Sequence, residues 1–577
     1  MDLTIRILEI NLTAKQVKVI ERADLSPYLG GVGLAGKLFT EYVHYNQEAL
    51  DPSQPVVLAC GPLSTIFPMA TKAVAVFRSP LTGAWGESYA GMRIALAMRM
   101  SGYQAIIIHG RAERPTYLVI GTKGVQFRDA SALWGLPTDE TGRILRQLVP
   151  GRGFRSCLRI GPAGESMIAF ANVNVDTYRH FGRLGLGAVF GSKLLKSVVV
   201  YGDRGESIPD FKRYREIYDQ IYQAAVNTDM MGKYHGLGTS VNVALLNSMG
   251  ALPTRNLKQS SFENVANISG EAFARDSLVR KVACSGCPVG CIHIGLRRRL
   301  FGPEYEYESA YLAYDHELIY ALGSQLGVSK QEQIYDLIEK VELAGMDAIS
   351  AGVLLAWLTE AQEQGLVTEK ELGVKLSFGS TDQYLKVLDQ IIKQPNELYR
   401  LLARGTYHTA EVLGGRAYAL APGKLEMAGY HTGYANLVGL SLGARHSHLD
   451  NAGYSIDQKA ARFNYSHDRV IDELIAEEKW RNVLNSLCIC LFAREIYTSK
   501  TICTALASVG INMTAEDLDS LGNKIFTLKN QARTSLGFNP DGIHFADRFF
   551  ETTAMAQELD RDTLVRLVKA YQAKTGL

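Results

Sequence analysis

"KVACSGCPVGCIHIG", from Lys281 to Gly295, carries three of the eight cysteines in a chain of 577 residues. Cys284, Cys287 and Cys291 have the spacing C-x2-C-x3-C. A structural zinc site usually combines two paired ligand sets, and no second C-x2-C pair exists in the sequence. Three thiolates on one loop with a distant fourth are typical of a four-iron cluster, which this spacing therefore favours over zinc. Three later cysteines are candidates for the fourth ligand: Cys488, Cys490 and Cys503.

The composition is that of an ordinary globular protein, with 47% hydrophobic residues, 21% charged residues and a net charge of +2. This near-neutral balance argues against nucleic-acid binding, which needs a basic face. No apolar run reaches the roughly 18 residues of a membrane span, so none is predicted. The N-terminus alternates like a strand and does not resemble a secretory signal. We therefore expect a cytoplasmic protein, in which clustered cysteines bind metal or do redox chemistry.

The character of the sequence changes near Pro209. Before it, apolar, β-branched runs such as "PVVLACGPLS" are bounded by glycine, proline and serine, which is typical of strands and turns. After it helical periodicity dominates, and Ser329 with Glu332 fits a capping box before an apolar stripe. The stripe consists of Ile334, Leu337, Ile338 and Val341. The pattern predicts an α+β fold. Three domains are expected, the first β-rich and the others mostly helical: 1–206, 207–413 and 414–577.

The glycine-rich stretch "GGVGLAGKL", Gly30 to Leu38, resembles two nucleotide-binding motifs without completing either. A P-loop needs Ser or Thr after its lysine, where Leu38 stands. A dinucleotide fold needs an acidic residue about 20 positions later, and Glu41 is too near. The stretch instead predicts a glycine turn that opens a helix.

Two polar segments of the second half hold candidate proton-transfer groups. "EMAGYHTGYANLVGLSLGARHSHLD" contains His431, His446 and His448 on a glycine-rich loop. "YESAYLAYDHELIY" contains Glu308 and Glu317 among tyrosines. Histidine and carboxylate are the usual general acids and bases, so these segments are candidate parts of an active site.

An ordered set of motifs resembles the tungsten-dependent aldehyde ferredoxin oxidoreductase family over nearly the whole chain. "CSGCPVGC" matches the family's C-x2-C-P-x-G-C loop, and the other motifs fall in family order. They are "SPLTG" (Ser79–Gly83), "IGPAGE" (Ile160–Glu165), "GRLGLGAVFGSKLLK" (Gly182–Lys196) and "LGSQLG" (Leu322–Gly327). The resemblance implies an N-terminal β-rich domain that forms a base for two pterins, followed by two helical domains. It also implies tungsten or molybdenum held by a bis-pterin, beside a [4Fe-4S] cluster.

The resemblance assigns the cluster ligands to Cys284, Cys287, Cys291 and Cys490. The fourth lies in "NSLCIC", where alignment on the following "LF" makes Cys490 the ligand and puts Cys488 in the family's glycine slot. The companion motif is "ELAGMD", and "RHFGR" matches the pterin segment. The residues that the resemblance places at the pterins are Lys72, Tyr89, Gly91, Arg179, His180, Gly182, Arg183, Glu342, Met346, Asp347 and Leu491.

Several positions depart from the family pattern. Tyr89 stands where the family has asparagine, which leaves open whether Mg²⁺ bridges the pterins. Lys72 replaces an arginine and so loses the bidentate fork, and Asn485 replaces an aspartate. The E-x-x-H motif that binds a bridging iron in some homodimers reads Asp336 to Glu339 without histidine, so an iron-linked dimer is not expected.

The resemblance implies oxidation of an aldehyde to a carboxylic acid, with electrons passing through the cluster to ferredoxin or an iron–sulfur subunit. The active-site carboxylate would be Glu317 or, as the alternative, Glu308. The histidine would be His448, with His446 as the fallback. We expect burial to raise the pKa of this carboxyl so that it can carry a proton.

Two other functions remain open. One is the catalytic subunit of a larger complex that reduces carboxylates or aromatic rings, for which the Arg297–Arg299 patch would dock an acidic carrier. The other is a cluster carrier without pterins. The sequence names neither the substrate nor the metal, and it leaves the oligomeric state open.

Overall fold

The computed structural model describes residues 4–149, 154–205, 208–229, 231–303 and 306–577, which fall into two units by their contacts. Unit 1 comprises Met1–Gly232, Ala283–Gly290 and Glu478–Phe538; unit 2 comprises Lys233–Val282, Cys291–Glu477 and Asn539–Leu577. The α+β fold class is confirmed, because unit 1 carries two large sheets and unit 2 is mostly helical. The three domain ranges stay a prediction.

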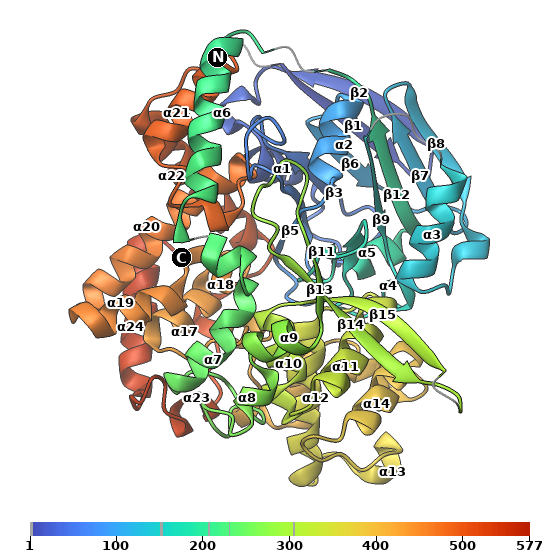
Figure 1. The fold of residues 1–577 in the computed structure, drawn as a ribbon, viewed down its shortest axis with the longest axis vertical. Helices are drawn as coiled ribbons and strands as arrows, with labels where there is room; N and C mark the ends of the chain where they lie inside the picture. Colours follow the sequence, from blue (N-terminus) through green and yellow to red (C-terminus); the bar gives the residue numbers. More distant parts are fainter. Residues whose placement is uncertain (1–3, 150–153, 206–207, 230, 304–305) are drawn as a thin grey trace. The chain divides into compact units, whose positions relative to one another are not determined.

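The first sheet of unit 1 has the strand order β2-β1-β6-β3-β4-β5 (Figure 1). Its strands are β1 (Ile5–Asn11), β2 (Gln16–Arg22), β3 (Val56–Cys60), β4 (Ala73–Arg78), β5 (Trp85–Ala90) and β6 (Ala105–His109). β1 and β6 are parallel and the other neighbours antiparallel. β3 is buried along its whole length, which explains its unbroken apolar run: strands covered on both faces do not alternate.

The second sheet of unit 1 has the order β11-β10-β9-β12-β7-β8 (Figure 1). Its strands are β7 (Thr116–Gly121), β8 (Gly124–Asp129), β9 (Phe154–Arg159), β10 (Val173–Val175), β11 (Arg179–Phe181) and β12 (Leu195–Gly202). Helix α2 (Ile94–Ser101) packs against β3 of the first sheet and β12 of the second. Its Ile94, Ala95 and Ala97 are fully buried, so this helix helps to join the two sheets into one core.

The helices of unit 1 come from both ends of the chain. They are α1 (Gly31–Tyr42), α2, α3 (Thr138–Leu148), α4 (Pro162–Glu165), α5 (Leu186–Ser192), α6 (Phe211–Val226), α21 (Ser499–Ser508) and α22 (Ala515–Ser535). α1 begins at Gly31, which confirms that the glycine-rich stretch opens a helix. α1 packs on β3, β4 and α22, so the C-terminal part of the chain completes the N-terminal unit.

Unit 2 combines a three-stranded antiparallel sheet with helices. The strands are β13 (Leu278–Val282), β14 (Ile292–Leu300) and β15 (Tyr307–Tyr314). The helices are α7 (Val241–Ser248), α8 (Val265–Ile268), α9 (Gly270–Asp276), α10 (His316–Leu322), α11 (Gln331–Ala344), α12 (Ala348–Glu363), α13 (Glu369–Leu372), α14 (Thr381–Lys393), α15 (Glu397–Leu402), α16 (Thr406–Leu413), α17 (Tyr434–Leu442), α18 (His448–Asn451), α19 (Gly453–Phe463), α23 (Arg548–Glu551) and α24 (Arg561–Thr575). α20 (His467–Ser486) runs from unit 2 into unit 1.

Local sequence patterns predicted the buried face of helix α11 correctly but not its N-cap. The predicted apolar stripe of Ile334, Leu337, Ile338 and Val341 is buried, as expected. The predicted capping box is wrong: the N-cap is Lys330, which makes no side-chain hydrogen bond to the helix. Packing of the apolar stripe, and not a cap, therefore holds the start of this helix.

Candidate functional site

The cysteine loop of unit 1 is tied by backbone hydrogen bonds to a second cysteine segment. The amide of Cys287 donates to the carbonyl of Cys284 (3.1 Å), which closes a tight turn. The amide of Met69 donates to the Gly286 carbonyl (3.2 Å), and the Met69 carbonyl accepts from the amide of Cys490 (2.9 Å). One residue thus bridges two segments that lie about 200 positions apart in the sequence. Within unit 1, three of the four predicted ligands come from these joined segments.

Cys488 and Cys490 occupy different environments. Cys490 is partly exposed, as are Cys284 and Cys287, and none of them forms a disulfide. Cys488 is fully buried, and burial, with the neighbouring Cys60, raises the pKa of its thiol well above the ordinary value. Its φ of 55° lies in the left-handed region that favours glycine. The thiol at 490 is therefore the accessible one.

Close packing of glycines fixes the approach of the chain to Cys490. A side chain at Gly31, in the first turn of α1, would overlap the carbonyl of Asn485 at the end of α20. A side chain at Gly61 would overlap the carbonyl of Leu487. The absence of side chains at both positions lets the residues before Cys490 lie directly against the first sheet, which is the structural role of the glycine-rich stretch.

Gly91 leaves space beside the cysteine loop. A Cβ atom there would lie 2.5 Å from Sγ of Cys284 and 3.5 Å from Nζ of Lys72. The Lys72 amide in turn donates to the carbonyl of Cys488 (3.1 Å). Two predicted cofactor-binding residues and one predicted ligand therefore lie together, with a lysine side chain next to the thiol.

We expect Gly91→Ala to lower the iron content of the anaerobically purified protein several-fold, because the methyl group would displace Sγ of Cys284 from its position. Iron and acid-labile sulfide per chain would measure the effect. Gly205→Ala is the matched control, since that residue of unit 1 is exposed and no atom lies within 4 Å of a Cβ there. Equal iron in Gly91→Ala and the wild type would contradict the expectation.

The predicted pterin segments of unit 1 lie on neighbouring strands. β11, which carries Arg179 and His180, packs beside β5, which ends near Tyr89. The hydroxyl of Ser79 donates to the carbonyl of Leu184 (2.8 Å), so the segments before β5 and after β11 are also joined. Gly182 and Arg183 follow β11 and are partly buried, as is Leu491 after Cys490.

Tyr89 belongs to a buried polar network. Its hydroxyl donates to Glu87 (2.7 Å), which also accepts from Nε1 of Trp85 (3.0 Å) and pairs with Nζ of Lys529 (2.6 Å). The Glu87 and Lys529 side chains are almost wholly buried, and buried charges are stable only when they are paired in this way. The tyrosine that replaces the family asparagine is thus anchored on β5 through its hydroxyl.

The remaining predicted ligand and pterin residues lie in unit 2. Cys291 precedes β14 directly and is partly exposed. Glu342 lies in the last turn of α11, Met346 is buried, and Asp347 is the N-cap of α12, accepting from the amide of Ile349 (3.0 Å). "ELAGMD" therefore forms the turn between two helices, and its aspartate holds the start of the second.

The proton-transfer candidates of unit 2 meet at the start of α10. Asp315 caps this helix by accepting from the amide of Leu318, which places Glu317 in its first turn. Nε2 of His448 lies 3.5 Å from Oε1 of Glu317, and the Tyr430 hydroxyl donates to the same oxygen (3.0 Å). His448 and Tyr430 are at most 5% exposed. The structure thus brings two predicted site residues, Glu317 and His448, together and adds Tyr430.

The protonation of Glu317 differs from the expectation. Burial alone would raise its pKa, but the hydrogen bond to His448 and the charges of His316 and His448 outweigh burial and lower the pKa to about 2. The prediction of a raised pKa is therefore wrong. It overlooked the two imidazoles, which stabilise the carboxylate and keep it ionised over the whole physiological range.

Aromatic rings surround this carboxylate. The Tyr430 ring stacks on Tyr454 with centroids 4.5 Å apart and lies 4.8 Å from the ring of His316 and 5.1 Å from that of His448. Asn242 hydrogen-bonds the Tyr430 side chain. Sequence reasoning missed Tyr430, Tyr454 and His316; the density of tyrosines and histidines in these two segments was the signal for them.

The other candidates lie elsewhere. Glu308 is on β15 and pairs with Arg299 on β14. His446 has a φ of 56°, and its Nδ1 contacts the carbonyl of Ser441 (3.1 Å), so it closes the end of α17. His431 is buried against Phe549 and bonds the Thr552 carbonyl (2.9 Å). Each of these three side chains has a partner other than Glu317, and His446 and His431 have structural roles.

Two of the three cations of the Arg297–Arg299 patch form ion pairs, while the docking role of the patch stays a prediction. Arg297 is 3% exposed and pairs with Asp336 and Glu339 of α11. Arg299 pairs with Glu308. These contacts engage Arg297 and Arg299 within unit 2, whereas Arg298 is exposed and lies over the ring of Tyr307, 4.6 Å from its centroid. The pair of carboxylates in the E-x-x-H-like segment therefore serves to hold Arg297.

A buried aspartate anchors the segment that carries Tyr430. Asp457 accepts from the amides of Ala435 (2.8 Å) and Asn436 (3.0 Å) at the start of α17, and Nδ2 of Asn436 donates to the Tyr430 carbonyl (2.6 Å). Burial raises the pKa of Asp457 to about 6, although its hydrogen bonds oppose this. The anchor is therefore pH-sensitive.

We expect Asp457→Asn to flatten the loss of stability between about pH 4 and pH 6. The folded pKa is raised, so the contribution of Asp457 is fully present below its unfolded pKa of 3.8 and is lost as pH rises through about 6. The shift corresponds to roughly 3 kcal/mol. Thermal unfolding of both proteins at several pH values measures it; a wild-type-minus-variant difference that is constant with pH would contradict it.

Among the residues described, no three His, Cys, Asp or Glu side chains converge so as to hold a single metal ion. No described helix has the length and apolar composition that a membrane span requires.

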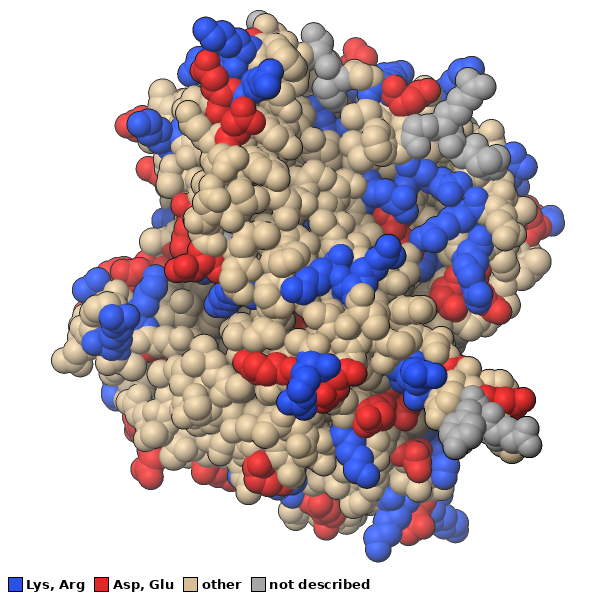
Figure 2. Space-filling view, viewed as in Figure 1, with Lys and Arg blue, Asp and Glu red and all other residues tan. Residues whose placement is uncertain are grey.

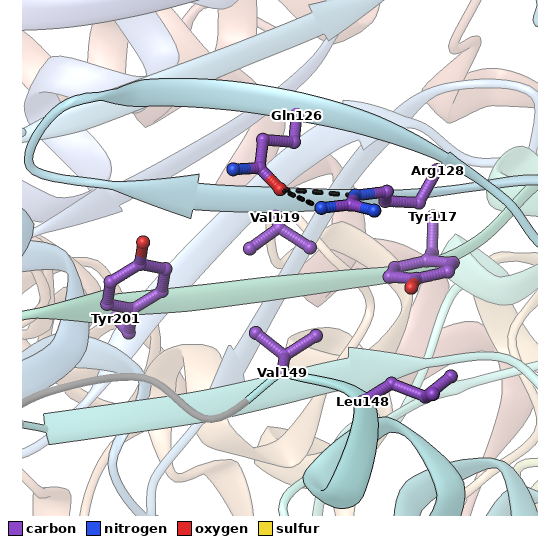
Figure 3. Close-up of a pocket in the computed structure, with 7 residues that line it drawn as sticks. All are labelled: Tyr117, Val119, Gln126, Arg128, Leu148, Val149 and Tyr201. Atoms are coloured by element: carbon purple, nitrogen blue, oxygen red, sulfur yellow. Dashed lines mark hydrogen bonds between the residues drawn. The ribbon is translucent and has the colours of Figure 1, made fainter.

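A surface pocket of unit 1 lies between β7, β8 and β12 and the end of α3 (Figure 3). Its lining residues are Tyr117, Val119, Gln126, Arg128, Leu148, Val149 and Tyr201. It contains none of the predicted site residues.

Comparisons with known proteins agree over nearly the whole chain. Residues 7–202 match the family model described as aldehyde ferredoxin oxidoreductase, N-terminal domain, and residues 215–576 match the model described as aldehyde ferredoxin oxidoreductase, domains 2 & 3. A tungsten-containing aldehyde ferredoxin oxidoreductase of Thermococcus kodakarensis is 30% identical, with 97% of this chain and 94% of the relative covered. The resemblance inferred from the motifs is confirmed.

Two further proteins similar to this chain have other activities in their names. The WOR-like subunit of an aliphatic sulfonate oxidoreductase of Pyrococcus furiosus is 28% identical over 70% of this chain and 66% of its own. A chain of the active site complex BamBC of benzoyl coenzyme A reductase, in complex with 1,5-dienoyl-CoA, has a TM-score of 0.83 at 18% identity, covering 100% of this chain and 95% of that one. At this identity the second likeness shows a shared fold.

Proposed function

Because the chain belongs to the aldehyde ferredoxin oxidoreductase family, we propose that it oxidises an aldehyde to a carboxylic acid and passes two electrons to an iron–sulfur carrier. The observation that carries the proposal is the junction of unit 1, in which Met69 joins the Cys284–Cys287 loop to Cys490. Each turnover converts RCHO and H2O into RCOOH, two protons and two electrons.

The cysteines fit a [4Fe-4S] cluster. Cys284, Cys287 and Cys490 are partly exposed, form no disulfide and come from two joined segments, and Gly91 keeps the space beside Cys284 open. A cluster binds each thiolate to a different iron, so its ligands need not converge on one point as those of a single ion do. Cys291, which follows the loop directly, is the proposed fourth ligand.

The polar residues of unit 1 fit an anionic pterin. Lys72, Arg179 and Arg183 are partly buried cations, and guanidinium groups suit phosphates because they can bind them bidentately. When bound, a tungsten or molybdenum bis-pterin would accept an electron pair from the substrate, and the cluster would pass the electrons on singly. We propose His180, Gly182, Gly91, Tyr89 and Leu491 of unit 1, and Glu342, Met346 and Asp347 of unit 2, as further pterin contacts. Whether Mg²⁺ joins the pterins depends on Tyr89.

Glu317 is the proposed base. Its carboxylate is ionised at rest because His448 donates to it, and in that state it is a weak base. If the N–H of His448 turns to the carbonyl oxygen of a bound aldehyde, burial becomes the dominant influence and raises the pKa of Glu317. Glu317 can then take the proton released on oxidation, while Tyr430 keeps it oriented through its hydrogen bond.

A second candidate function is the catalytic subunit of a larger reductase complex. The relative named as a WOR-like subunit favours it, since that protein is one part of an assembly. Affinity purification from the native cell would distinguish the two: a stoichiometric small iron–sulfur protein that co-purifies supports the complex.

The test of the proposal is elemental analysis of protein purified without oxygen, followed by dye-linked assays. About one tungsten or molybdenum and about four irons per chain, with aldehyde-dependent reduction of a viologen dye, are expected. Zinc alone would overturn the proposal. Iron without tungsten or molybdenum would indicate a cluster carrier.

A further inference from the structure

Helix α6 of unit 1 carries a row of aromatic side chains. Phe211, Tyr214, Tyr218 and Tyr222 recur at three- and four-residue spacing and so share one face. Their successive ring centroids are 5.8, 5.8 and 6.4 Å apart. The two ends of the row face solvent, with Phe211 63% and Tyr222 38% exposed. Large aromatic groups in contact with water are costly, and they are enriched in protein–protein interfaces.

The inner side of this row reaches the segment that joins the cysteines. The Tyr214 ring packs edge-on against Phe67, with centroids 5.2 Å apart, and its hydroxyl donates to the Ile66 carbonyl (3.0 Å). Three residues further along, Met69 holds Gly286 and Cys490. α6 is thus connected to both cysteine segments through the short stretch 66–69.

A buried tyrosine binds the same short stretch from another segment of unit 1. Tyr497 is fully buried, and its hydroxyl donates to the Pro68 carbonyl (2.5 Å). Tyr214 of α6 and Tyr497 therefore both bind the 66–69 stretch, whose Met69 holds the Gly286 carbonyl of the cysteine loop.

The exposed end of the row is cationic. Lys212, Arg213 and Arg215 lie in the first turns of α6, and in the part of the chain that the structure describes they form no ion pair. Figure 2 shows Lys and Arg atoms gathered over the upper end of this helix, with acidic atoms below them. Lys500 on α21, which packs against α6, is also exposed. By contrast, the Arg297–Arg299 patch is largely occupied by ion pairs within unit 2.

We propose that this face, defined by Phe211, Arg215, Tyr218 and Tyr222 and called the α6 face, is the docking surface for an acidic iron–sulfur electron carrier. The proposal rests on the proposed function. At each encounter the reduced cluster gives one electron to one oxidised carrier, so one aldehyde reduces two carriers. Unpaired cations steer the acidic partner, and the aromatic side chains supply the area that is desolvated on binding.

The test measures binding and electron transfer separately. The probe is a purified acidic [4Fe-4S] ferredoxin, titrated into the anaerobically purified enzyme by calorimetry and used as acceptor in the aldehyde assay. The variants are Phe211→Ala/Tyr222→Ala and, independently, Arg215→Glu. The matched control is Phe463→Ala/Tyr311→Ala, whose side chains are 57% and 59% exposed but belong to unit 2.

We expect both α6 variants to raise the Kd and the KM for ferredoxin at least about 10-fold, with the viologen-linked rate and the melting temperature unchanged. Added salt should weaken wild-type binding and have less effect on Arg215→Glu. Unchanged ferredoxin affinity in both variants, equal losses in the control, or no binding to the wild type would overturn the proposal. Absence of viologen-linked activity would instead overturn the proposed function, and the calorimetry would still decide on the α6 face.

Discussion

Cys490→Ala will lose most of its iron, from about four per chain to below about one, whereas Cys488→Ala will keep it. The measurement is iron and sulfide content after anaerobic purification, together with the low-temperature electron paramagnetic resonance signal of the reduced protein. We expect aldehyde oxidation to be abolished in the first variant and retained in the second, because electrons cannot leave without the cluster.

The reason lies in the state of the two thiols. A thiolate is the metal ligand, and burial keeps Cys488 protonated by raising its pKa well above the ordinary value. Cys490 is partly exposed, and its amide is bound to Met69, which also holds the Cys284–Cys287 loop. Cys488 instead stands with a φ of 55° where glycine is favoured.

The control for this prediction is the pair itself, since both residues lie on one short segment. A loss of iron in both variants, accompanied by a lower melting temperature, would indicate a structural role for Cys488. Loss of iron in Cys488→Ala alone would contradict the assignment of the ligand. Cys503→Ala, on α21, should leave the iron content unchanged.

Local patterns made the fold class predictable, and they are also the basis of the predicted cluster, which stays a prediction. C-x2-C-x3-C spacing, apolar β-branched runs and helical stripes all act within a few residues of one another. The α+β class is confirmed on that basis, and so is the glycine turn at Gly31. The assignment of Cys490 over Cys488 came from the family likeness, since spacing alone left both open.

Contacts between distant segments could not be predicted from the sequence. Tyr430 meets Glu317 across 113 positions, and Arg297 on β14 meets carboxylates on α11. The direction of the Glu317 pKa shift depends on two imidazoles whose positions only the fold determines. The α6 face could not be predicted from the sequence either, because only the fold brings Tyr214 and Tyr497 into contact with the 66–69 stretch.

Glu317→Gln will lower kcat at least about 100-fold, which is the usual contribution of a general base. Glutamine keeps the size of the side chain and an acceptor for Tyr430, but it cannot take a proton. The matched control is Glu308→Gln, which removes an exposed ion pair with Arg299 on β15 and should change kcat less than about twofold. Metal content and melting temperature of both variants should equal those of the wild type. A large loss in Glu308→Gln with an active Glu317→Gln would reverse the assignment.

The pH dependence separates a base from a residue that only positions others. Because the pKa of Glu317 is lowered to about 2, its carboxylate form persists as pH falls and is lost only near pH 2. The profile of kcat/KM, which reports the free enzyme, should therefore show no acid limb from this group near its ordinary value of 4.5. The profile of kcat should show one, because substrate draws His448 away and burial then raises the pKa of the carboxyl. In His448→Gln, whose side chain has no imidazole charge, the acid limb should appear in kcat/KM as well. Identical limbs in both profiles of the wild type would contradict the proposed transfer of the hydrogen bond.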